Sequence, residues 1–150
     1  MRGFDVRVFV IMCVFLLGGL SVAQAPTQAD EYEMHWRAAT NALVAFSTAE
    51  MIASEGAPGN HSQLTETYKR EHDNFAREIA WISQSKPEPR QFLRQWKLIP
   101  VYDQVLSAMT IVTDAAQRND SAAEAAGWAS FRDALTELRG TIEEITHANE

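Results

Sequence analysis

Apolar side chains recur every three or four residues along most of the chain, a spacing typical of amphipathic helices that share a core. Four stretches carry this pattern, at about residues 30–55, 62–83, 90–118 and 121–145, and short polar, glycine- or proline-containing breaks separate them. The steps of three and four are close to those of a coiled-coil seam, as in Trp128, Phe131, Leu135, Leu138, Ile142 and Ile145. Four helices of similar length joined by short loops predict an all-α, antiparallel, up-down-up-down four-helix bundle.

Residues that favour helix ends support these boundaries. Thr27 is placed to cap the first helix, and the segment 56–59 (Gly-Ala-Pro-Gly) ends it. Ser121 and Glu124 match a capping box at the start of the fourth helix. Pro100 lies within the third stretch, where a proline either kinks a helix or marks the first turn of a new one, and both outcomes stay open.

The N-terminal residues are typical of a secretory signal. Arg2 and Arg7 flank a short charged start, which an apolar run from Val8 to Leu20 follows. Ser21-Val22-Ala23 then supplies the small residues that a signal peptidase reads. The run of 13 residues is shorter than the ~20 needed to span a bilayer, which favours a cleaved signal over an anchor. We predict a signal peptide at 1–23 and one bundle domain at 24–150. Ten arginines against three lysines, with abundant alanine, suggest a GC-rich bacterial source. Because a signal is followed by no later membrane span, we expect a periplasmic or secreted protein that meets the membrane only during export.

Charge and cysteine content narrow the function classes. The chain has 13 basic and 20 acidic residues, and removal of 1–23 takes away two arginines and one aspartate, which changes the net charge from −7 to −8. A nucleic-acid partner is therefore not expected. Cys13, the sole cysteine, lies in the signal, so the mature protein has no disulfide and no thiol nucleophile. No nucleophile elbow, phosphate loop or Cys-x-x-Cys occurs, and we predict no catalytic residues and no enzyme.

One end of the predicted bundle gathers aromatic residues around a histidine. His35 lies about 20° from Phe46 on the helical wheel, so it faces inward, and Trp36 and Trp96 are at its level. Two interpretations are open. His35, Trp36 and Trp96 form a cofactor-binding pocket for a flat ligand or haem, or these bulky residues fill the bundle end while His35 bonds a carbonyl or a tyrosine.

Acidic residues near the core raise the question of a metal site. Glu50 continues the apolar stripe of the first helix and is expected to point inward at the opposite end. Glu71 and His72 flank the seam of the second helix, but adjacent residues diverge by about 100°. No Glu-x-x-His pair of the kind that builds di-metal bundles occurs. We predict no metal site and expect Glu50 to bond Tyr68 or a tryptophan N–H, or to reach solvent.

The last third of the chain carries a family resemblance. Residues 115–126, followed by Phe131, Leu135, Leu138 and the C-terminal His147, resemble the last helix of periplasmic haem bundles of the cytochrome c′ kind and their non-covalent b-type relatives. The Cys-x-x-Cys-His motif of that family is absent, since residues 143–146 (Glu-Glu-Ile-Thr) stand where the cysteines would be. The resemblance implies the bundle fold and, as an alternative function, a non-covalent haem b in periplasmic electron transfer.

Helix geometry favours a bundle without a resident cofactor. Met34 and His147 are the pair that would ligate a haem across the bundle, but each lies about 200° around its helix from a core position and faces solvent. We predict an exported, non-enzymatic bundle that binds a protein or a small ligand, neither of which the sequence identifies. A homodimer would form through an exposed face, and Met34, Met51 and Trp81 point away from the seams.

Overall fold

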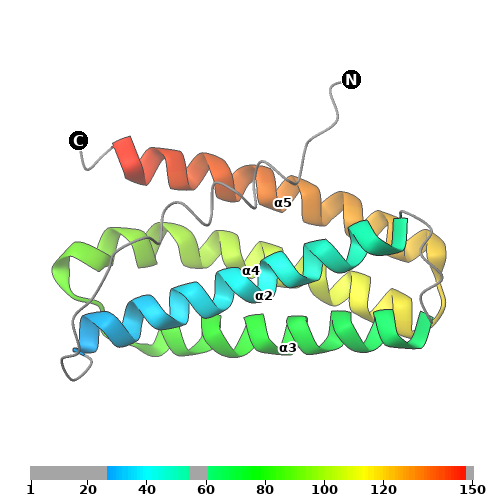
Figure 1. The fold of residues 1–150 in the computed structure, drawn as a ribbon. Helices are drawn as coiled ribbons and strands as arrows, with labels where there is room; N and C mark the ends of the chain where they lie inside the picture. Colours follow the sequence, from blue (N-terminus) through cyan, green and yellow to red (C-terminus); the bar gives the residue numbers. More distant parts are fainter. Residues whose placement is uncertain (1–26, 55–60, 148–150) are drawn as a thin grey trace.

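The computed structural model describes residues 27–54 and 61–147 (Figure 1). These residues contain no strand and form four helices, α2 (Gln28–Ser54), α3 (His61–Gln84), α4 (Pro89–Gln117) and α5 (Ser121–His147). The prediction of an all-α fold with four helices is confirmed, and each helix end lies within two residues of its expected place. The predicted signal peptide at 1–23 lies outside the described residues.

The helices lie lengthwise along one another, in agreement with a four-helix bundle (Figure 1). Their backbones approach closely in three pairs, α2 with α3, α3 with α4, and α4 with α5. Contacts join the early part of one helix to the late part of the next. His35 of α2 contacts Glu78 of α3, and Lys97 of α4 contacts Glu144 of α5. The helices whose backbones approach closely are therefore consecutive in the chain.

The predicted apolar stripes form a single core. Leu64, Ile142 and Ile145 lie partly buried at its margin. The other apolar residues at the three- and four-residue spacing are buried, namely Tyr32, Trp36, Ala39, Leu43 and Phe46 of α2, Tyr68, Phe75, Ile79 and Ile82 of α3, Leu98, Tyr102, Val105, Met109, Val112 and Ala116 of α4, and Trp128, Phe131, Leu135 and Leu138 of α5. The helices need this shared core because burial of one apolar face stabilises them more than their own propensity does. In the part of the chain that the structure describes, no helix combines the length and the apolar character needed to cross a membrane.

Aromatic rings join α2 to α5, whose backbones do not approach as closely as those of the other neighbouring helices. Phe46 of α2 lies with its ring centroid 5.2 Å from that of Trp128 and 5.4 Å from that of Phe131, both on α5. Tyr68 of α3 packs on Phe46 at 5.1 Å and on Trp128 at 5.5 Å. This aromatic cluster fills the wider space between the first and last helices.

By contrast, α5 lies very close to α4 at Gly127. A Cβ atom at this buried glycine would lie 2.9 Å from Cγ2 of Val112 and 3.0 Å from the backbone nitrogen of Val112. Only a residue without a side chain fits at that distance. Gly140 on the same helix is different, since its Cβ would meet nothing within 4 Å.

Side-chain caps start the first and last of these helices. Thr27 Oγ1 accepts the N–H of Asp30 at 3.2 Å, and the Asp30 carboxylate accepts the N–H of Thr27 at 2.9 Å, which confirms Thr27 as the cap of α2. At α5 the Asp120 carboxylate accepts the N–H of Ala123 at 3.0 Å. The prediction of Ser121 as this cap is therefore wrong by one residue, because the stronger acceptor precedes it.

Pro100 lies inside a continuous α4. The question of whether it breaks the third helix is thus answered, since the helix runs on either side of it. A proline nitrogen has no hydrogen to donate, so the carbonyl of Trp96 loses its helical donor. Pro100 is exposed and lies on the outer side of the helix.

Candidate functional site

His35 lies where α2 begins and α3 ends, and its partner is a carboxylate. Its Nδ1 atom lies 2.5 Å from Oε2 of the buried Glu78, and its ring stacks on Trp81 with 3.7 Å between the centroids. Arg77 Nε donates to the other Glu78 oxygen at 3.2 Å. The expectation that His35 bonds a carbonyl or a tyrosine is therefore wrong, because its hydrogen-bond partner is the carboxylate of Glu78 on the facing helix.

The Glu78 contact orients the imidazole of His35. A carboxylate at Nδ1 holds the proton of the neutral ring there and leaves Nε2 as the acceptor. Among the described residues Nε2 makes no hydrogen bond. In the same part of the chain, no group of three or more histidine, cysteine, aspartate or glutamate side chains is placed to hold a metal ion.

Trp36 belongs to the core beside this histidine. It is 1% exposed, and its ring packs on Tyr32 and Tyr102 at centroid distances of 6.1 and 5.4 Å. The Arg94 guanidinium lies 4.8 Å from the ring centroid, a cation–π contact. Burial raises the pKa of the Tyr32 hydroxyl, and the nearby Trp36 indole opposes this rise. The indole N–H itself is buried, and none of the described residues offers it an acceptor in hydrogen-bond geometry, which is a cost to stability.

Trp96 points away from His35. It is 67% exposed on the outer face of α4, so the prediction that it lines an inward pocket with His35 and Trp36 is wrong. It stands two residues before the buried Leu98, hence about 200° around the helix from the core. Trp81 takes the place beside His35 and packs against the core, whereas the sequence pattern predicts that it points outward.

Gln95 ties three helices together at this end. The Tyr32 hydroxyl of α2 donates to Gln95 Oε1 at 2.7 Å. Gln95 Nε2 in turn donates to the carbonyls of Ile82 and Ser85 at 3.0 and 3.3 Å, where the end of α3 leaves carbonyls without helical donors. The available sequence signal was an amide three residues before Leu98, a spacing that puts both on the inward face.

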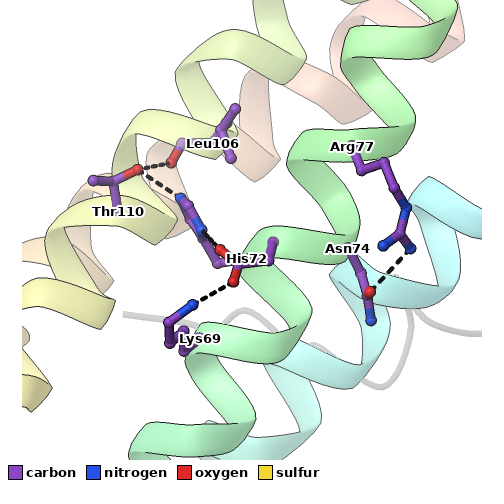
Figure 2. A network of polar contacts seen from close by, with 7 residues as sticks. Lys69, His72, Asn74, Arg77, Leu106 and Thr110 are labelled. Atoms are coloured by element: carbon purple, nitrogen blue, oxygen red, sulfur yellow. Dashed lines mark hydrogen bonds and ion pairs between the residues drawn. The ribbon is translucent and has the colours of Figure 1, made fainter.

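A polar network follows α3 along the edge of the core. The buried Glu71 accepts from Arg70 Nε at 2.7 Å and from Asn74 at 3.3 Å. Arg77 donates to Asn74 at 3.0 Å (Figure 2). Arg77 also donates to Glu78, so the network extends to the carboxylate that contacts His35. The sequence signal for this network is the Arg-Glu dipeptide, which occurs twice with one heptad between the copies.

The His72 side chain points toward α4 (Figure 2). Its neighbour Glu71 instead bonds residues of its own helix, α3. The Nε2 atom of His72 lies 2.9 Å from Thr110 Oγ1, and its Nδ1 atom lies 3.0 Å from an oxygen of Asp73. The Thr110 hydroxyl donates to the carbonyl of Leu106 at 2.9 Å, so Nε2 of His72 is the donor in the histidine contact. The predicted divergence of Glu71 and His72 is confirmed, and each has a structural partner.

Glu50 lies half-buried at the far end, beside α5. Its Oε1 atom is 3.6 Å from an Arg132 nitrogen, so its partner is Arg132 and not Tyr68 or a tryptophan. Burial raises the pKa of the Glu50 carboxyl, the Arg132 charge opposes this, and the Glu124 charge adds to it.

We expect Glu50→Gln to stabilise the protein at neutral pH. A raised pKa means that the folded state binds the Glu50 proton more tightly than the unfolded chain, in which a glutamate has a pKa of about 4.3. The wild type therefore loses stability as the pH rises from about 4.3 through the raised pKa, and the amide does not. Urea unfolding should show an advantage for the variant at pH 7 that disappears below pH 4. Glu66→Gln, at an exposed position on α3, is the control. A variant less stable than the wild type at pH 7 would mean that the Arg132 contact outweighs burial.

The outer side of the bundle carries a groove between α4 and α5. Its volume is about 380 Å³, and it is lined by Gln104, Ser107, Ala108, Ile111, Ser130, Asp133, Ala134 and Glu137. Four of these side chains are serine or alanine, Ile111 is 45% exposed, and the two carboxylates stand on the α5 wall. Two large aromatic side chains, Phe92 and Trp96, are 62% and 67% exposed on the outer side of the same α4 helix. Large exposed aromatic side chains are typical of a contact surface.

The two side chains that would ligate a haem across the bundle face solvent. Met34 is an exposed residue of α2, and His147 is exposed at the end of α5. The helix geometry expected for both is confirmed.

No protein-family model matches the chain, and neither a curated protein nor a solved structure matches it.

Proposed function

We propose that this chain is an exported, non-enzymatic bundle, with a signal at 1–23, that acts by binding a protein through the outer face of α4. The observation that carries the proposal is the exposure of Phe92 and Trp96 on the outer side of α4, the helix that also forms one wall of the α4/α5 groove. Large aromatic side chains are frequent anchors of protein interfaces, because they bury much area with few rotatable bonds. The interior histidine and carboxylates have structural partners, which supports binding over catalysis.

The proposed bundle is antiparallel, with an up-down-up-down order of helices. Contacts between α4 and α5 support this topology, since residue numbers rise on one helix as they fall on the other. Lys97 bonds Glu144 at 2.8 Å, and Gln104 bonds Glu137 at 3.3 Å. The outer groove lies between these two helices, and both contribute lining residues.

A non-covalent haem b in periplasmic electron transfer is the second candidate, and one observation favours it. Glu78 holds Nδ1 of His35, and this leaves Nε2 as a potential axial ligand. The residues around it do not fit a macrocycle, because Trp36 is packed into the core and Trp96 lies outside. Trp81 also covers one face of the imidazole. We therefore place protein binding first.

Photo-crosslinking in the cells that produce the protein tests the proposal. A benzophenone amino acid replaces Trp96, or Ser107 in the groove, and replaces the exposed Thr48 and Glu66 on α2 and α3 as matched controls. We expect positions 96 and 107 to give a discrete crosslinked protein band and the control positions to give none. Equal crosslinking everywhere, or none at position 96, would contradict the proposal. A Soret band that haemin produces in the purified protein, and that His35→Ala removes, would favour the haem candidate instead.

A further inference from the structure

The groove between α4 and α5 combines a small apolar floor with an acidic wall. Ala108 and Ala134 are buried at its base, and Asp133 and Glu137 are exposed on its α5 side. We propose that this groove holds a basic helix of the partner protein, with lysine or arginine side chains one turn apart. The inference rests on the proposed function and names the chemistry of the partner.

The two carboxylates of the α5 wall lack a basic neighbour. Among the described residues neither Asp133 nor Glu137 makes an ion pair, and the contact of Glu137 is with the neutral amide of Gln104 at 3.3 Å. Arg132 and Arg139 of the same helix lie roughly 160° around it from the groove residues, and Arg132 contacts α2 instead. The negative charge of this wall is therefore left for a partner to neutralise.

The α4 wall adds no positive charge. Over residues 98–117 the charged side chains of α4 are the exposed Asp103 and Asp114. The basic residues next along the chain, Lys97 and Arg118, stand about 10 Å beyond the two ends of the groove, and Lys97 bonds α5. A cationic partner is favoured over an acidic one, because complementary charges guide docking and like charges oppose it.

The spacing of the acidic wall matches a helix. Asp133 and Glu137 are four residues apart on α5, so their carboxylates stand about 6 Å apart along its axis. Basic side chains at positions i and i+4 of a partner helix have the same spacing. The small or aliphatic side chains beside them would pack on Ala108, Ala134 and the exposed Ile111, as in other helix-in-groove complexes.

Binding of a model peptide to the purified protein, followed by fluorescence polarisation, is the first test. The peptide is an amphipathic helix with lysines at i and i+4 among alanines and leucines, and its counterpart has glutamate in place of each lysine. We expect the lysine peptide to bind more tightly, with an affinity that falls as the salt concentration rises. Equal binding of the two peptides, or no binding of the lysine peptide, overturns the inference.

Neutral variants locate the bound peptide. Asp133→Asn combined with Glu137→Gln should weaken its binding about tenfold, as expected for the loss of two exposed ion pairs. Glu31→Gln combined with Glu66→Gln removes the same charge from exposed positions on α2 and α3 and should leave the affinity unchanged. Ser107→Trp fills the groove without a change of charge and should also weaken binding, with the helical circular dichroism preserved. An equal loss in both double variants would mean attraction by net charge alone and overturns the site.

Crosslinking in the cell separates this inference from the proposed function. The benzophenone at position 107 should join a segment with paired basic residues, and Asp133→Asn with Glu137→Gln should weaken that crosslink. A crosslink to a segment without such residues, or to a second copy of this acidic chain, overturns the inference and leaves the proposed function standing. No crosslink from position 96 overturns the proposed function, and this inference with it.

Discussion

Phe46→Ala should lower the free energy of unfolding by about 3–5 kcal/mol, the range for removal of a fully buried phenylalanine. Phe46 is completely buried, and its ring contacts Tyr68, Trp128 and Phe131 at centroid distances of 5.1, 5.2 and 5.4 Å. It stands where α2 and α5 meet through side chains and not through close backbone approach. The helices therefore cannot close the cavity by a small shift, and the cost should lie in the upper part of the range.

Urea unfolding followed by circular dichroism measures this loss. Phe46→Leu keeps most of the apolar volume and is the matched control, with an expected cost of less than about 1.5 kcal/mol. Hydrogen exchange should show that the amides of α2 lose more protection than those of α4 and α5, which keep their own close contact. A loss below about 1 kcal/mol in Phe46→Ala would show that the aromatic cluster does not hold α2 to α5.

Gly127→Ala should destabilise the protein by about 1–3 kcal/mol, as other overpacked core substitutions do. The added methyl would lie 2.9 Å from Val112 Cγ2 and 3.0 Å from its backbone nitrogen, so α5 must move away from α4. The intrinsic preference of alanine for helix, about 1 kcal/mol over glycine, acts in the opposite direction and is too small to offset this. A shift of several degrees in Tm follows for a domain of this size.

Gly140→Ala on the same helix is the control, and its effect should have the opposite sign. The new methyl group meets nothing within 4 Å, so only the helix preference acts, and the variant should gain about 0.5–1 kcal/mol. Thermal unfolding of the two variants side by side decides the matter. If Gly127→Ala gains as much stability as Gly140→Ala, the two helices are not in the tight contact described.

The fold was largely predictable because one periodicity controls it. An apolar residue at every third or fourth position places each stripe on one face of a helix, and the stripe residues form the core. The outward faces of Met34 and His147 follow from the same geometry. Trp96 shows that the axial level of a residue in the bundle does not by itself predict whether its side chain faces inward. It shares the axial level of His35, but its angle around α4 turns it outward.

The partners of the polar side chains were less predictable. Glu78 reaches His35 because of the relative rotation of α2 and α3, which no spacing within one helix records. The repeated Arg-Glu dipeptide indicates a polar edge of α3 beside the core, but it does not identify His35 as the partner of Glu78. The partners of Gln95 were equally hard to predict, since they are carbonyl groups at the end of α3 that lack helical donors. The groove depends on the closeness of α4 and α5, which Gly127 permits and apolar periodicity does not reveal.

The close helix pairs are all consecutive in the chain, and this has a consequence for folding. Contacts between segments that are near in sequence lose little chain entropy when they form, and proteins built from such contacts fold in microseconds to milliseconds. Each helix can dock on the one before it as soon as both exist. The packing of Phe46 on Trp128 and Phe131, like the Glu50–Arg132 ion pair, joins the first described helix to the last and requires both to be in place. We therefore expect this aromatic closure to form late, after three helix pairs are in place.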